Sequence, residues 1–72
     1  MKRRDLKRKI IERAQELDIQ DVYRREGGKH ELLICQGIQV TIPRHKDIDT
    51  YTAESIMKAL EPVLGKDWWR NA

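Results

Sequence analysis

Histidine is the residue type in this sequence best suited to moving protons near neutral pH, and the chain has two of them. His30 follows the pair Gly27-Gly28 with Lys29 between them, and His45 follows shortly after Pro43. Both positions are typical of turns and sheet ends rather than of a packed core. The two histidines are therefore the first candidates for chemistry, with ordinary solvated surface groups as the alternative interpretation.

A hairpin about Gln36-Gly37 would bring His30 to the end of a sheet at which Arg44 lies. Lys29 and Arg44 would then surround His30 with positive charge, and His45 is a further candidate for the same cluster. Such a set suits RNA cleavage. A base removes the proton of a 2′-hydroxyl, the oxygen attacks the adjacent phosphate, and a cation stabilises the charge that develops. We expect His30 to be the catalytic residue.

Other chemistry has less support in the sequence. The alternation of His45, Asp47 and Asp49 offers metal ligands, but roles in caps and turns explain these residues as well. Cys35 is interpreted as a small apolar residue of a strand rather than as a catalytic thiol. The sequence contains no phosphate-binding loop, nucleophile elbow or dinucleotide fingerprint. We therefore expect neither a metal site nor a cofactor.

The positive charge of the chain is concentrated at its start. Six of the 15 Lys and Arg residues lie in residues 2–9, beside one acid, whereas the remaining nine basic and 11 acidic residues leave a balance of −2. Arg3, Arg4, Lys7 and Arg8 have the wrong sign for the positive end of a helix dipole. Clustered cations favour a polyanionic partner. The cluster is predicted to hold RNA phosphates, with a solvated face as the alternative.

The apolar periodicity predicts a first helix over residues 3–17, in which Leu6, Ile10, Ala14 and Leu17 form the stripe that faces a core. Three strands follow, over residues 22–25, 29–35 and 38–42, and Pro43 ends the last of them. The run 32–34 is apolar throughout, so periodicity does not decide which face of the sheet His30 shares.

A second helix is predicted over residues 52–64, with Asp49, Thr50 or Thr52 as its N-cap, Gly65 as its stop and a kink at Pro62. The order of elements predicts an α+β fold of the type α-β-β-β-α, with two helices on one face of a three-stranded antiparallel sheet. At 72 residues we expect a single domain. The absence of a long apolar run predicts a cytoplasmic protein without a membrane partner.

Three segments in sequence resemble the HicA family of bacterial toxins: residues 1–6, the turn and strand start at residues 27–30, and residues 40–45 followed by Ile48 and a final helix. The resemblance extends from residue 1 to about residue 64. It implies a fold similar to the double-stranded-RNA-binding domain and ribosome-independent cleavage of mRNA. It also implies a HicB-type antitoxin that covers the active site.

The catalytic histidine of that family follows a Gly-Ser-x-His type of motif, and the matching position is His30. The sequence departs from this motif, with Gly28 where serine is common and Lys29 where a polar residue or a second histidine often stands. Residues 18–21 replace a glycine-aromatic pair that is common after the first helix. Residues 65–72 lie beyond the usual end of the family and are treated as a C-terminal extension.

Two alternatives remain open at the level of sequence. One is a non-catalytic RNA-binding module of the same topology, although the second helix begins with one acid and a single lysine instead of a strongly basic turn. The other is a DNA-binding or structural adaptor that uses the basic first helix. Of the adjacent Trp68 and Trp69, we expect one to cover the apolar seam and the other to be exposed, where it could contact a partner.

Overall fold

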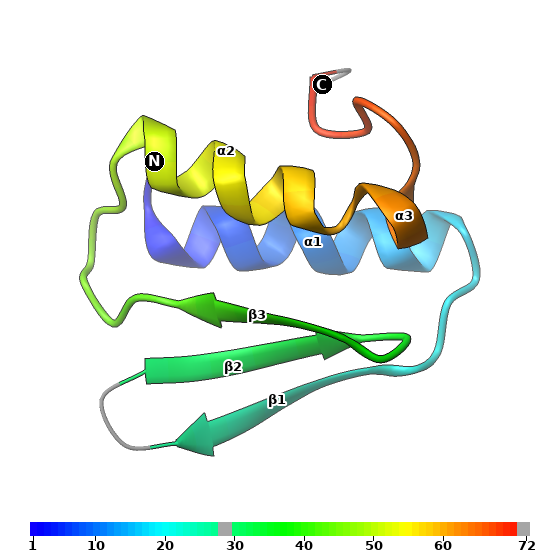
Figure 1. Cartoon of the computed structure of the whole chain (residues 1–72), viewed down its shortest axis with the longest axis horizontal. Helices are drawn as coiled ribbons and strands as arrows, with labels where there is room; N and C mark the ends of the chain where they lie inside the picture. Colours follow the sequence, from blue (N-terminus) through cyan, green and yellow to red (C-terminus); the bar gives the residue numbers. More distant parts are fainter. Residues whose placement is uncertain (28–29, 71–72) are drawn as a thin grey trace.

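The computed structural model describes residues 1–27 and 30–70. Its elements are α1 (Arg3–Glu16), β1 (Val22–Gly27), β2 (His30–Cys35), β3 (Ile38–Ile42), α2 (Thr50–Ala59) and α3 (Glu61–Leu64). The strands form one antiparallel sheet in the order β1-β2-β3, and the helices lie on one side of it (Figure 1). The predicted α+β architecture is confirmed. No helix within these residues is long and apolar enough to cross a bilayer.

The turn between β2 and β3 sets the register of the sheet. Gln36 and Gly37 have φ values of 48° and 84°, which is the pair of positive values that a two-residue hairpin turn of type I′ requires. Cys35 consequently pairs with Ile38, and the ladder continues to Glu31 opposite Ile42. The hairpin predicted at this position is confirmed. Strand β3 ends before Pro43, which cannot donate to a ladder.

The burial along β2 shows which of its side chains face the helices. Glu31, Leu33 and Cys35 are at most 1% exposed and lie on the side covered by α1 and α2. Successive side chains of a strand point to opposite faces, so His30 lies on the open face of the sheet. Burial raises the pKa of the Cys35 thiol, as expected for a small residue packed in the core.

Helix α1 packs against the sheet through Leu6, Ile10 and Ala14, as its periodicity predicts. Leu17 does not belong to this stripe, because the helix ends at Glu16 and the side chain of Leu17 is 42% exposed. Asp18, with φ 56°, turns the chain away from the helix axis toward β1. The prediction that Leu17 contributes to the core is therefore wrong.

The second predicted helix is two helices in the structure. Helix α2 starts at Thr50, and the Asp49 carboxylate accepts a hydrogen bond of 3.1 Å from the Thr52 N–H, which identifies Asp49 as the N-cap. Hydrogen bonding from the side chain of Thr52, followed by its backbone N–H, lowers the pKa of Asp49. The helix is interrupted at Leu60, and Pro62 lies in the first turn of α3. Backbone N–H groups in the first turn have no partner within the helix, so a proline there costs no helical hydrogen bond.

The segment after Gly65 completes the core. Trp68 is 5% exposed, and its indole Nε1 donates a hydrogen bond of 2.9 Å to the Met57 carbonyl. Trp69 is half-buried, donates to Glu61 at 3.1 Å and carries the Arg70 guanidinium over its ring. One tryptophan covers the seam, as predicted, but the other is less exposed than expected. The segment treated in the sequence analysis as a C-terminal extension thus supplies a core side chain.

Candidate nucleic-acid interface

His30 is the first residue of β2 and is exposed to solvent. It pairs with Gly27 of β1, and the next residue of β2, Glu31, pairs with Ile42 of β3. His30 therefore lies beside Pro43, at the end of the sheet that the hairpin register predicts. Its side chain is on the open face, away from the helices.

The register also shows which residues share this face with His30. Arg25 is opposite Leu32, two positions along β2 from His30, and such diagonal neighbours are about 7–8 Å apart and within reach of a long side chain. Tyr23, two positions further from the turn, is 53% exposed on the same face. Sequence reasoning missed Arg25 and Tyr23. Successive residues of a strand point to opposite faces, so counting back in steps of two from Gly27, at the turn after β1, places Arg25 and Tyr23 on the same face as His30.

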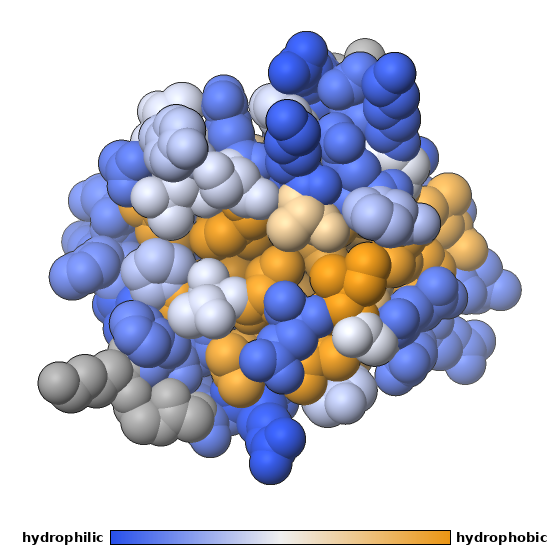
Figure 2. Space-filling model, viewed as in Figure 1, coloured by the Kyte–Doolittle hydropathy of each residue, from blue (hydrophilic) through white to orange (hydrophobic). Residues whose placement is uncertain are grey.

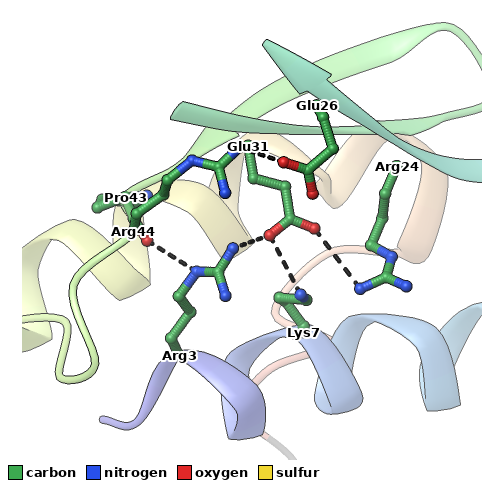
Figure 3. Close-up of polar contacts among 7 residues, drawn as sticks. All are labelled: Arg3, Lys7, Arg24, Glu26, Glu31, Pro43 and Arg44. Atoms are coloured by element: carbon green, nitrogen blue, oxygen red, sulfur yellow. Dashed lines mark hydrogen bonds and ion pairs between the residues drawn. The ribbon is translucent and has the colours of Figure 1, made fainter. Parts of the chain in front are cut away.

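Arg44 lies on the helix side of the same end of the sheet, where it forms an ion pair and hydrogen bond with the Glu26 carboxylate (Figure 3). This contact lowers the pKa of Glu26. Glu26 is opposite Glu31 in the register, and Glu31 faces the helices. Among the described residues, the cation that the register places diagonal to His30 on the open face is Arg25, whereas Arg44 is engaged by an acid on the other side.

Glu31 is a buried carboxylate beneath the first turns of α1, with only 2% of its side chain exposed. Arg3 and Lys7, four residues apart on α1, both contact its Oε1, with Lys7 Nζ at 3.1 Å (Figure 3). Arg24 of β1 approaches Oε2 to 3.6 Å. Burial, followed by repulsion from Arg3 and Arg24, lowers the pKa of Lys7.

This cluster gives part of the basic first helix a structural role. Removing one partner of a buried ion pair typically costs about 3–5 kcal/mol, because the other charge is left without compensation. The Arg3 and Lys7 side chains are 24% and 14% exposed, so they retain some water and the lower end of that range applies. Arg3 also donates from Nε to the Pro43 carbonyl at 3.0 Å, which fastens α1 to the end of β3.

Cations at this end of the molecule, among them Arg3 and Arg44 of the ion pairs above, form a positively charged hollow of about 320 Å³. It lies between the start of α1 and the segment after β3, and its lining consists of Lys2, Arg3, Arg4, Arg44 and Lys46. Among the residues that the structure describes, no acid lines it. The backbone holds its two walls together, since the Arg3 N–H donates to the Lys46 carbonyl at 3.0 Å. We call this feature the cationic hollow.

The four basic residues predicted to hold phosphates therefore divide into two groups. Arg3 and Arg4 line the cationic hollow, and the Arg4 side chain is 80% exposed. Lys7 points to Glu31, and Arg8 forms a hydrogen bond of 2.7 Å with Asp5. Helical spacing alone does not show that Arg3 and Lys7 are engaged by Glu31, because that contact depends on where Glu31 lies.

His45 is exposed in the connection between β3 and α2 and does not line the cationic hollow. Within residues 1–27 and 30–70, no three His, Cys, Asp or Glu side chains come together in a group that could hold a metal ion. Gly27 ends β1 opposite His30. Gly28 and Lys29, named above as a turn residue and a phosphate-binding residue, lie outside the described residues.

We compared the chain with known protein families, curated proteins and solved structures, and no match was found.

Proposed function

We propose that the protein is a HicA-type toxin, an endoribonuclease that cleaves mRNA in the cytoplasm without the ribosome. The observation that carries this proposal is the position of His30. It is exposed on the open face of the sheet, diagonal to Arg25 of β1, at the same end of the molecule as the cationic hollow. A proton-transfer group, a cation near it and a separate phosphate-binding surface are what RNA cleavage requires.

In this proposal the neutral imidazole of His30 removes the proton of a ribose 2′-hydroxyl. The 2′-oxygen attacks the adjacent phosphorus, the bond from phosphorus to the 5′-oxygen breaks, and that oxygen takes a proton from solvent water, while the exposed His30 returns its proton to solvent. The products are a 2′,3′-cyclic phosphate and a 5′-hydroxyl. Arg25 stabilises the negative charge that develops on the phosphate oxygens, and the exposed ring of Tyr23 offers a surface for a base to stack on.

A toxin of this kind needs an inhibitor in the cell that makes it. We propose a HicB-type antitoxin that covers the open face around His30 and so excludes RNA. Arg25 and Tyr23 would contact it there, because both are exposed on that face. The surface proposed to bind the antitoxin is distinct from the cationic hollow, which lies on the helix side at this end of the sheet.

The direct test uses purified protein and an mRNA in a buffer without ribosomes. We expect fragments with 2′,3′-cyclic phosphate ends, and the same fragments in the presence of EDTA, because the described residues contain no group of metal ligands. Loss of cleavage in EDTA would contradict the metal-independent mechanism. RNA that is bound but remains intact would favour the non-catalytic RNA-binding module instead.

A second test addresses the cationic hollow. Changing Arg4 and Lys46 together to glutamine should weaken RNA binding and reduce the log–log salt slope by about 0.7 for each single-strand phosphate contact that is lost. Both side chains are exposed, so the fold should be unaffected. The matched control changes Lys58 and Lys66 to glutamine; both are also exposed but lie outside the hollow. An equal slope in the two double variants would show that the hollow does not bind phosphate.

A further inference from the structure

Strand β3 is an edge of the sheet that lacks the usual protection against pairing with another strand. Its residues, Ile38–Ile42, carry no charge, whereas 38% of the residues in the chain are charged. The opposite edge, β1, contains Arg24, Arg25 and Glu26. Charged side chains and prolines are the common means of blocking an edge strand, and within β3 both are missing. The two edges of this sheet therefore differ in their ability to accept a further strand.

The hairpin determines which backbone groups of β3 are available. Cys35 and Ile38 flank the two-residue turn and form a hydrogen-bonded pair, so the bonds to β2 come from Ile38 and every second residue after it. The N–H and C=O groups of Gln39 and Thr41 consequently point away from β2. An unpaired row of donors and acceptors of this kind is a template for strand addition.

A groove of about 400 Å³ runs along this edge, between β3 and α2. Its floor contains Val40 and Ile56, and its α2 wall presents Tyr51, Ser55 and Ala59 at successive turns. Tyr51 is 81% exposed. Figure 2 shows apolar residues reaching the surface over the gap between α2 and β3. In the part of the chain that the structure describes, no charged residue lines the groove.

We propose that this groove binds a second copy of the same chain, with the two β3 strands paired antiparallel about a two-fold axis at Val40. In that register Ile38 faces Ile42 of the partner subunit, and the outward amides of Gln39 meet those of the partner's Thr41. Each side of the axis gains a hydrogen-bonded pair, and the two sheets become one continuous sheet.

The composition of α2 favours a second copy over an unrelated partner. Helix α2 runs antiparallel to β3 (Figure 1), so the two-fold axis places the two α2 helices antiparallel across the groove. Tyr51 then covers Ala59 of the partner subunit, and Ser55 lies near the axis. A large exposed ring at one end and a small residue at the other make the groove self-complementary. The uncharged lining avoids like-charge contacts between two chains that each carry a net charge of +3.

This inference does not depend on the proposed ribonuclease function. A two-fold axis perpendicular to the sheet keeps both open faces on the same side, and the cationic hollow remains outside the contact. His30 of each subunit stays exposed at its own end of the joined sheet. The dimer and the RNA site can therefore be tested separately.

The experiment is sedimentation equilibrium of the full chain from micromolar to near-millimolar concentration. We expect a rise from the monomer mass of 8.6 kDa toward twice that value. Ser55→Arg should raise the dissociation constant at least about tenfold, because two like charges would meet near the axis. The control, Gln15→Arg on the exposed surface of α1, should dimerise as the wild type does.

Thr41→Pro provides a second variant that leaves the β2 ladder intact. It removes one outward N–H from an edge strand, where proline is tolerated, so circular dichroism should be unchanged while dimerisation weakens. The proposal is overturned if the wild type stays monomeric over the whole range. It is equally overturned if folded Ser55→Arg and Thr41→Pro variants dimerise like the Gln15→Arg control.

Discussion

His30→Ala should lower the rate of RNA cleavage by about 10²–10⁴-fold, the usual contribution of a well-placed proton-transfer group. The fold should be unaffected, because His30 is exposed at the start of β2 and the core lies on the other face of the sheet. The measurement is the single-turnover rate on a labelled RNA, with circular dichroism of each variant. Expression of the wild type should arrest bacterial growth, and expression of His30→Ala should not.

Matched variants identify the groups that assist His30. His45→Ala should lower the rate less than His30→Ala, since His45 is in the connection after β3 and outside the register that positions Arg25. Arg25→Gln should reduce the rate more than Arg44→Gln, because Arg44 is engaged by Glu26. If His30→Ala kept nearly full activity and His45→Ala were inactive, the catalytic role would be assigned to the segment after Pro43.

Trp68→Ala should lower the free energy of unfolding by about 3–5 kcal/mol, the range for truncating a buried aromatic side chain. The indole is 5% exposed, packs in the main cluster and donates a hydrogen bond to Met57. A single core in a domain of this size rarely supplies more than about 3–5 kcal/mol, so this loss would leave much of the protein unfolded. Urea unfolding followed by far-ultraviolet circular dichroism measures it, independently of the tryptophan fluorescence that the variant removes.

Two further variants separate packing from hydrogen bonding at this position. Trp68→Phe keeps most of the apolar contact and loses the bond to Met57, so the expected cost is about 1–3 kcal/mol. Trp69→Ala should cost less than Trp68→Ala, because Trp69 is only half-buried. If neither Trp68→Ala nor Trp69→Ala changed the free energy of unfolding, the segment after Gly65 would be an extension and not part of the domain.

Local patterns in the sequence are sufficient to predict most of the backbone. The apolar periodicity of α1, the Gln36-Gly37 turn and the Asp49 cap each depend on residues close together in the chain. Their energies come from contacts within one turn or one hairpin, so a short window contains the required information. The exceptions are local as well: Leu17 follows the last residue of the helix, and Leu60 separates α2 from α3.

The sequence by itself determined the order of the elements and, through the hairpin, the end of the sheet at which His30 lies. Only the tertiary structure decided which face His30 occupies and which cations remain free for a ligand. The reason is that Glu31 is buried against α1 and engages Arg3 and Lys7, which are 28 and 24 residues away in the chain. An ion pair between such distant residues depends on how the helix docks, and no periodicity within either segment specifies that docking.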